Sequence, residues 1–335
     1  MAKFILSKSK VFEQLEILKS LSDEISYSVK TNQEIAKILQ GYCLFSVHSF
    51  DNIELISDKS KIWFFLQGNK KEEIKNLLNK GIKGFVVDNI NDLNILLENL
   101  DTKISLLLRM KLKEHTLYTG KHFVFGFYSE KINELIPELK NNKYIAQIGI
   151  HFHRKTQNVS EWSLKQEIEQ SITAENLKKI DIINIGGGIP AEYKNFRKEI
   201  ISSVFDKIKE LKEFLKEKKI KLILEPGRFI AAPAIKLETR IINIYDNNIV
   251  VDCSVYNSAM DTFVANIRLL VENESETGES YTIKGYTPDS VDIFRYSVKF
   301  KKRPKIGDKI VFLNAGAYNY SSNYFNLPKL GTEIV

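Results

Sequence analysis

The chain has 335 residues, of which 43% are hydrophobic and 27% are charged, a composition typical of a soluble globular protein. Lys and Arg outnumber Asp and Glu by 49 to 42, but the lysines are scattered through helical stretches, which argues against a nucleic-acid-binding module. The only cysteines, Cys43 and Cys253, exclude a disulfide framework and a multi-cysteine zinc site. Without a secretory leader or a long apolar run, we expect a cytoplasmic protein that does not contact membranes.

From about residue 15 to residue 233, short β-rich segments alternate with amphipathic segments of helical length. The expected strands are residues 25–30, 42–48, 62–67, 84–88, 104–110, 145–153, 180–188 and 221–227. Expected helices lie between most of them, for example at 72–82, 91–100 and 195–219. The strands lack period-two alternation, as is typical of parallel strands covered on both faces, and the regular repetition predicts an α/β fold with a closed (β/α)8 barrel.

The pattern changes after Pro233. The segments 236–254, 279–290 and 307–318 are rich in β-branched residues and turn signals. We therefore predict a barrel domain at 15–233 and a C-terminal antiparallel β domain at 234–335, to which we also assign residues 1–14.

Polar side chains end most of the expected barrel strands. In a (β/α)8 barrel the functional groups gather there, because the loops that follow the strands share one mouth. The residues in question are Lys30, His48, Asp88, Arg109, His151, His153, Gly186–Gly188 and Glu225. They are the candidate site.

Lys30 follows an apolar strand, where a lysine is usually a surface residue whose stem packs on apolar neighbours. At a barrel mouth, however, a lysine is partly desolvated, which lowers the pKa of its amine. The neutral amine can form an imine with an aldehyde cofactor. Lys30 is therefore a candidate catalytic residue.

Two further segments suit a phosphate and a pyridine ring. Gly186–Gly188 directly follow a strand, so backbone N–H groups can approach a phosphate, although a tight turn also explains the glycines. Arg228 can bind phosphate oxygens and Glu225 can keep a pyridine nitrogen protonated, although a turn with a salt bridge also explains residues 225–228. Together with Lys30, these groups meet the requirements of pyridoxal 5′-phosphate.

The motifs resemble, in the same order, those of the fold-type III pyridoxal-phosphate decarboxylases, which include ornithine, diaminopimelate and carboxynorspermidine decarboxylases and share the alanine-racemase-like barrel. YSVKTN at 27–32 resembles the family's cofactor-lysine motif, and GIHFHRKTQ at 149–157 resembles its histidine strand. IGGGIP and EPGRF are near-verbatim matches. The resemblance extends to residues 67–71, 251–258, 285–292 and 314–326, and so covers nearly the whole chain.

The resemblance implies roles for individual residues. Lys30 would carry the cofactor as an imine, His153 would stack on its ring and Glu225 would pair with the ring nitrogen. Asp88 and Arg109 would support the cofactor's surroundings. The phosphate would be held by Thr156, Gly187, Gly188, Gly227, Arg228 and Tyr318.

The resemblance also implies a homodimer with shared active sites. Asp289 would take part in catalysis and substrate binding across the subunit boundary. Asp261 is a plausible ligand for a distal amine of the substrate, although turn formation explains it equally well. Tyr286 and Tyr324 are further candidates for substrate contact.

Several positions depart from the family pattern. Pro288 stands where the family has a cysteine that assists reprotonation, so Tyr286, Tyr324, Lys30 or water must supply that proton. Lys155-Thr156 replace a Gly-Ser pair, and residues 123–126 read FVFG in place of Lys-Phe-Gly. Because the chain is also short for the family, we expect a specialised branch in natural-product biosynthesis.

The same motifs also allow other interpretations, namely a zinc site, simple packing, a racemase or a non-catalytic cofactor carrier. His151 and His153 lie on one face of a strand and suit zinc, but no third ligand is evident, so we expect no metal. His48 and Tyr318 are also explained by packing. A racemase of the same fold would place an arginine where Glu225 stands, and a non-catalytic cofactor carrier would lack the β domain. We therefore expect a carboxy-lyase that acts on an amino acid or an amino-acid-like group.

Overall fold

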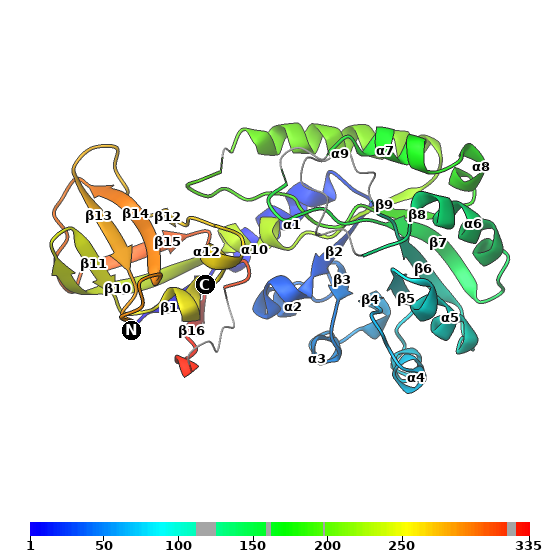
Figure 1. Ribbon diagram of the computed structural model, residues 1–335, viewed down its shortest axis with the longest axis horizontal. Helices are drawn as coiled ribbons and strands as arrows, with labels where there is room; N and C mark the ends of the chain where they lie inside the picture. Colours follow the sequence, from blue (N-terminus) through cyan, green and yellow to red (C-terminus); the bar gives the residue numbers. More distant parts are fainter. Residues whose placement is uncertain (112–124, 159–161, 197, 320–325) are drawn as a thin grey trace. The chain divides into compact units, whose positions relative to one another are not determined.

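The computed structural model describes residues 1–111, 125–158, 162–196, 198–319 and 326–335 (Figure 1). Its contacts group the chain into two compact units. The barrel unit comprises residues 16–189 and 201–226, and the β-rich unit comprises residues 1–15, 190–200 and 227–335. The domain limits expected from the sequence place residues 15, 190–200 and 227–233 in the barrel instead, and this expected division into domains stays a prediction.

The barrel unit contains a closed barrel of parallel strands (Figure 1). Neighbours pair in chain order, and the barrel closes where Ile25 of the first strand pairs with Leu224 of the last. The strands are β2 (Glu24–Ser28), β3 (Leu44–Val47), β4 (Ile62–Phe65), β5 (Gly84–Val87), β6 (Ile104–Arg109), β7 (Ile145–His151), β8 (Ile182–Asn184) and β9 (Lys221–Leu224). Each overlaps one of the eight expected segments, so the predicted (β/α)8 barrel is confirmed.

Helices connect the strands because their sequences place apolar residues on one face. In α9 (Ile200–Glu217), the buried residues Val204, Ile208, Leu211 and Leu215 recur at a spacing of three or four. This helix begins later than the expected residue 195. The other helical elements of the unit are η1 (Val29–Thr31), α2 (Gln33–Ile38), α3 (Phe50–Ile53), η2 (Lys59–Lys61), α4 (Lys71–Asn79), α5 (Ile90–Glu98), α6 (Ser129–Lys140), α7 (Leu164–Ser171) and α8 (Ala174–Leu177).

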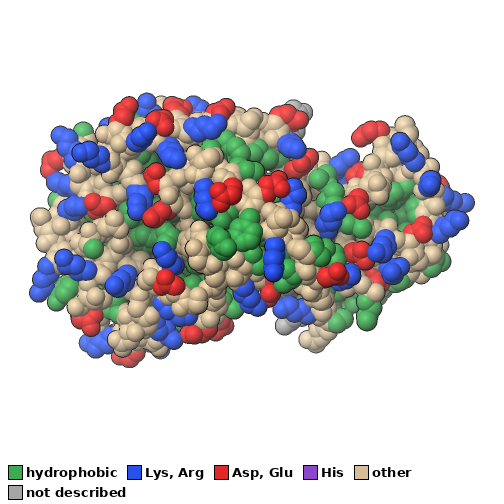
Figure 2. Space-filling view, turned by 180° about the vertical axis from the view of Figure 1, so that it is seen from behind, with side chains coloured by type: hydrophobic (Ala, Val, Ile, Leu, Met, Phe, Trp, Pro, Cys, Tyr) green, Lys and Arg blue, Asp and Glu red, His purple; other side chains and the backbone are tan. Residues whose placement is uncertain are grey.

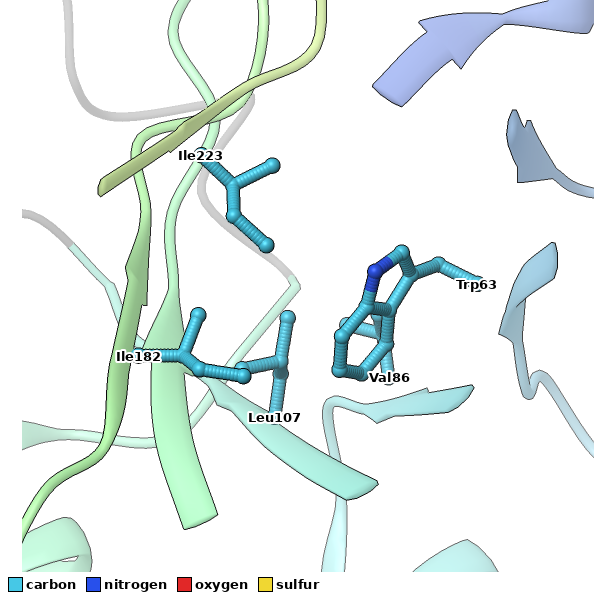
Figure 3. Packing of buried hydrophobic residues seen from close by; sticks show 5 residues of the cluster. All are labelled: Trp63, Val86, Leu107, Ile182 and Ile223. Atoms are coloured by element: carbon cyan, nitrogen blue, oxygen red, sulfur yellow. The ribbon is translucent and has the colours of Figure 1, made fainter. Parts of the chain in front are cut away.

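An apolar layer fills the inside of the barrel. Figure 3 shows Trp63, Val86, Leu107, Ile182 and Ile223, which come from five different strands and point into the enclosed space. These side chains are at most 6% exposed. The layer is therefore a packed core, and it forms the floor under the polar residues at the strand ends.

The β-rich unit holds a sheet with the strand order β12-β15-β10-β11-β13-β14. Most neighbours are antiparallel, as predicted, but β11 and β13 run parallel. Its strands are β1 (Lys3–Leu6), β10 (Ile235–Tyr245), β11 (Asn248–Val251), β12 (Leu270–Val271), β13 (Glu279–Lys284), β14 (Ile293–Phe300), β15 (Lys309–Leu313) and β16 (Gly331–Ile334). It also contains α10 (Arg228–Ala234), α11 (Val255–Ser258) and α12 (Asp261–Val264).

The N-terminal strand β1 is part of this sheet. It pairs antiparallel with β10 and parallel with β16, so both ends of the chain join one sheet edge. The helix α1 (Lys8–Lys19) then leads from one unit to the other.

Two observations concern nucleic-acid binding and membrane spanning, which the sequence analysis did not favour. On the face drawn in Figure 2, Lys and Arg side chains are interspersed with Asp and Glu and form no single basic block. Among the helices that the structure describes, none is long and apolar enough to cross a membrane.

Candidate active site

A polar layer lies inside the barrel, one step beyond the apolar core toward the C-terminal strand ends. Side chains two residues apart on a strand face the same way. Arg109 therefore follows Leu107 on β6, and Asn184 follows Ile182 on β8. Glu225 follows Ile223 in the same way at the end of β9. The alternation of the strands thus turns several chain-distant polar residues into one ring at the barrel mouth.

Lys30 lies in η1, the short turn that follows β2. The Ser28 N–H donates to the Pro226 carbonyl at 3.1 Å, and the Tyr27 hydroxyl donates to the Asn32 carbonyl at 3.1 Å. These two bonds brace the turn from both sides. The Lys30 side chain is exposed to solvent, but the surrounding protein partly desolvates its amine and lowers its pKa, with Glu225 opposing the shift and Arg109 adding to it.

Glu225 is the centre of the polar layer and is only 5% exposed. Its Oε1 accepts from Ser46 Oγ at 2.8 Å and from Asn184 Nδ2 at 2.9 Å, and its Oε2 lies 3.2 Å from His151 Nε2. Burial alone would raise the pKa of this carboxyl, but the hydrogen bonds donated by His151 and Ser46 favour the ionised form and keep the pKa below its usual value. Glu225 is therefore a fixed, ionised carboxylate.

His153 stands just beyond β7, beside the glycine segment. Its Nδ1 accepts from the Gly187 N–H at 3.3 Å. Surrounding protein desolvates the ring, and with the nearby Lys30 this lowers the pKa of His153 to about 3. His153 is thus a neutral ring at the mouth.

His48 also lies at this mouth. From the sequence, a role at the site could not be distinguished from simple packing for this residue. Its ring stacks on Phe65 with centroids 4.4 Å apart and an interplanar angle of 14°. Desolvation, followed by the charge of Lys30, lowers the pKa of His48 to about 3. His48 is therefore a second neutral imidazole near the lysine.

The glycines at 186–188 are required by close backbone contacts. Gly186 has a φ of +66°, and a Cβ there would lie 2.2 Å from the Phe152 carbonyl oxygen. A Cβ at Gly187 would lie 3.0 Å from the Glu225 carbonyl oxygen. The bare backbone of this segment therefore lies against the ends of two neighbouring strands, which is the approach that a phosphate cradle needs.

The remaining predicted residues of the barrel unit surround this centre. Asp88 is buried after β5, and its Oδ1 accepts from Asn89 Nδ2 at 2.8 Å. Desolvation lowers the pKa of Arg109, while Asp88 and Glu225 oppose the shift. Thr156 lies in the turn after β7. The structure thus places Arg109 within electrostatic reach of both Asp88 and Glu225.

Two of the predicted residues of the β-rich unit, Asp261 and Tyr318, lie around a third, Arg228, which follows Gly227 at the start of α10. Arg228 Nη1 donates to the Tyr193 hydroxyl at 3.0 Å and to a carboxylate oxygen of Asp261. The guanidinium carbon lies 5.1 Å from the centre of the Tyr318 ring. Arg228 and Tyr318 are therefore neighbours, as a shared phosphate role requires, whereas Asp261 contacts an arginine rather than open space.

Asp289 and Tyr286 lie in the loop between β13 and β14. Asp289 Oδ2 accepts from the Tyr256 hydroxyl at 2.8 Å, and its Oδ1 accepts from the Val291 N–H at 3.1 Å. The Tyr286 side chain is 37% exposed. These two groups remain accessible to a substrate, and Tyr324 lies outside the described residues.

The sequence reasoning missed several partners of the predicted residues. Ser46 and Asn184 donate to Glu225, and Tyr193 binds Arg228. One signal was available, because Ser46 and Asn184 precede the strand ends at the spacing that faces the barrel interior. No group of three or more His, Cys, Asp or Glu side chains in the described segments is arranged to hold a metal ion.

Comparisons with known proteins agree with this geometry. The family model described as "Pyridoxal-dependent decarboxylase, pyridoxal binding domain" matches residues 8–232. The diaminopimelate decarboxylase of Staphylococcus aureus (strain COL) is 25% identical over 305 residues, which cover 81% of this chain and 70% of that protein. The ornithine decarboxylase of Caenorhabditis elegans is 24% identical over 257 residues, which cover 71% of this chain and 59% of that protein.

A solved structure agrees in fold along the whole chain. The diaminopimelate decarboxylase from Helicobacter pylori, complexed with L-lysine, superposes with a TM-score of 0.84 at 20% identity and covers 100% of this chain and 91% of that one.

Proposed function

Because this chain belongs to the family of pyridoxal-dependent decarboxylases, we propose that it removes the α-carboxylate, as CO2, from an amino acid or from an amino-acid-like group of a larger metabolite. The enzyme is a carbon–carbon lyase, and its cofactor is pyridoxal 5′-phosphate. The observation that supports the proposal best is that Lys30, whose amine has a lowered pKa, and the buried carboxylate of Glu225 stand at the ends of neighbouring barrel strands, with Glu225 acting electrostatically on Lys30.

The residues present fit the cofactor. Lys30 offers an amine whose lowered pKa favours the neutral form that reacts with an aldehyde. A Cβ at Gly186 would clash with the Phe152 carbonyl oxygen, and a Cβ at Gly187 would lie in tight contact with the Glu225 carbonyl oxygen. Glu225 provides the anion that keeps a ring nitrogen protonated, a role for which the arginine expected in a racemase is unsuited.

Each part of the site has one task in the proposed reaction. When bound, pyridoxal 5′-phosphate supplies an electron sink for the electron pair that CO2 leaves behind. Lys30 would hold the cofactor, and His153 would cover one face of its ring. Glu225 would keep its negative charge for the ring nitrogen. Asp88 and Arg109 balance charge around it.

We assign the phosphate to two groups of residues. In the barrel unit these are Thr156, Gly187 and Gly188, and in the β-rich unit they are Gly227, Arg228 and Tyr318. The support is the glycine segment in the first group, where side chains would meet neighbouring backbone, and the neighbouring Arg228 and Tyr318 in the second. The arginine fork suits phosphate oxygens.

The substrate has an α-amino-acid end, and we assign its contacts to Asp289, Tyr286 and Tyr324. The relatives and the similar structure act on or bind diaminopimelate, ornithine and L-lysine, according to their names. Pro288 has no acidic hydrogen, so the proton that replaces CO2 comes from Tyr286, Tyr324, Lys30 or water. This departure favours a specialised substrate, such as a siderophore or polyamine precursor or the carboxy-aminopropyl group of a peptide-nucleotide antibiotic.

We also propose a homodimer with shared active sites, in which Asp289 acts across the boundary. Three apolar side chains close to Asp261 and Asp289 in sequence, Phe263, Val264 and Val291, are 40%, 78% and 51% exposed. Such side chains are typical of a surface that a second subunit covers. Mixing Lys30→Ala with Asp289→Ala subunits tests this arrangement, because one intact site per mixed dimer restores part of the activity that each variant lacks.

The decisive experiment measures CO2 release by the cofactor-loaded enzyme from ornithine, lysine, arginine, diaminopimelate and carboxynorspermidine. The Lys30→Ala variant should release none, and borohydride should no longer fix the cofactor to the protein. Lys37, an exposed lysine paired with Glu34, provides the matched control, and Lys37→Ala should behave as wild type. Full activity in Lys30→Ala would reject the assignment. If the wild type binds the cofactor but none of the five substrates reacts, larger natural-product substrates are tested next.

A further inference from the structure

Three buried donors surround the Glu225 carboxylate, and their directions can be worked out from proton counting. An ionised carboxylate only accepts, so the single hydroxyl proton of Ser46 points to Glu225. Ser46 must then accept from Ser26, whose Oγ lies 2.7 Å away. The Asn184 amide is also fixed, because its oxygen accepts from the Gly186 N–H at 2.8 Å and its nitrogen faces Glu225.

The same proton counting defines which ring nitrogen of His151 carries a proton. Its Nε2 faces Oε2 of Glu225 and must carry the proton. Its Nδ1 is buried and has no hydrogen-bond partner among the described residues, so a proton on Nδ1 would be unsatisfied. The edge-to-face contact with Phe65, at 5.1 Å and 83°, fixes the plane of the ring. His151 is therefore a neutral donor with one available direction.

The two carboxylate oxygens of Glu225 differ in how many hydrogen-bond acceptor positions remain free of protein donors. A carboxylate has about four acceptor positions. Oε1 uses two of them for Ser46 and Asn184, whereas Oε2 uses one for His151. One position therefore remains on Oε2, the oxygen that His151 orients.

We propose that His151 is a positioning residue that holds Glu225 Oε2 so that its remaining acceptor position receives the N–H of the cofactor's ring nitrogen. This inference rests on the proposed function and adds to it the residue and the oxygen atom responsible. His151 does not touch the substrate, and it acts only through Glu225. Ser46 and Asn184 hold the other oxygen and fix the carboxylate plane.

The first test uses cofactor-free protein, so it does not depend on the proposed reaction. Ring-nitrogen NMR of the labelled histidines should show His151 neutral, with its proton on Nε2, from pH 5.5 to 8. Desolvation, which lowers the pKa of His151, agrees with this expectation. A proton on Nδ1 in that range would overturn the proposal, whatever the enzyme's activity.

The second test measures the 15N shift of the labelled cofactor ring nitrogen in the loaded enzyme. In His151→Leu the shift should move toward the unprotonated value, and kcat should fall roughly 10- to 100-fold, as for residues that orient a ligand of a reactive centre, with KM changed less than threefold. His151→Gln keeps a donor and should recover most of both. Ser46→Ala, which removes a donor from Oε1, should move the shift less than His151→Leu does.

A wild-type 15N shift and kcat in His151→Leu would overturn the proposal. If His151→Leu fails to fold, the His151→Gln variant and the tautomer measurement on the wild type decide the question. Failure of the wild type to bind the cofactor at all would count against the proposed function instead, because the tautomer of His151 is measured without it.

Discussion

Arg228 and Asp261 form an ion pair in which each side chain is only 3% exposed. The same Nη1 of Arg228 also donates to the Tyr193 hydroxyl at 3.0 Å. Desolvating two charges is costly, and the loss of either partner leaves the other buried and uncompensated. The position of Asp261 therefore favours a role in holding Arg228 over the expected contact with a distal amine of the substrate.

Substitution of Asp261 distinguishes these two roles. Asp261→Ala should lower the free energy of unfolding by about 3–5 kcal/mol, because it strands the Arg228 charge. Urea denaturation of the cofactor-free protein measures this. Asp289→Ala serves as the control and should cost about 1 kcal/mol or less, since its hydrogen bonds from Tyr256 and the Val291 N–H lie at a half-buried site where water can replace the carboxylate. A raised KM with unchanged unfolding in Asp261→Ala would instead point to substrate contact.

Replacement of the Glu225 carboxylate should separate cofactor binding from turnover. Glu225→Gln is neutral, so we expect kcat to fall roughly 100-fold or more, because the negative charge beside the ring nitrogen is lost. Cofactor affinity, measured by absorbance titration, should change much less, since Lys30 and the phosphate groups are intact. A kcat within threefold of wild type contradicts this role.

The lowered pKa of Glu225 also predicts how the stability difference between wild type and Glu225→Gln depends on pH. The pKa of Glu225 is lowered in the folded protein, against a value of about 4.3 in an unfolded chain. The stabilisation from this difference is present above pH ~4.3 and is lost as the pH falls through the lowered pKa. The difference in unfolding free energy between wild type and Glu225→Gln should therefore shrink between pH 6 and pH 3. A difference that stays constant over this range would contradict the lowered pKa.

Two histidines at the mouth should remain neutral at physiological pH. Surrounding protein desolvates His48 and His153, and this lowers the pKa of each to about 3. Below the unfolded value of about 6.5, only the unfolded chain takes up protons at these positions, so stability falls as the pH drops toward 3. NMR should show neither ring titrating between pH 5 and 8, and His48→Gln should lose less stability than wild type from pH 7 to pH 5.

The glycine segment allows a steric prediction. Gly186→Ala combines a φ of +66° with a Cβ 2.2 Å from the Phe152 carbonyl oxygen, so we expect a loss of at least about 2 kcal/mol of stability and weaker cofactor binding. A Cβ at Gly331 would have no heavy atom within 4 Å, and Gly331→Ala should stay within about 0.5 kcal/mol of wild type. Thermal unfolding and cofactor titration measure both. Equal stability of the two variants would show that the close approach at Gly186 relaxes.

Local sequence was sufficient for the barrel and for the ends of its strands. Apolar runs bounded by turns predict where a strand begins and ends, and a closed barrel brings all C-terminal ends to one mouth. Lys30 and Glu225 are far apart in the chain, yet each was assigned from its own strand end. The later start of α9 and the parallel pair β11–β13 were not anticipated, because these features depend on contacts between distant segments.

Sequence by itself determined which residues stand at the mouth: Lys30, His153, Glu225 and the glycines each follow a strand whose local pattern is readable. Only the tertiary structure decided their partners. Ser46, Asn184 and His151 come from three different strands and converge on Glu225, and Asp261 meets Arg228. The reason is physical, since hydrogen bonds and ion pairs act over about 3 Å between side chains and depend on how the strands close in space, which periodicity along the chain does not encode.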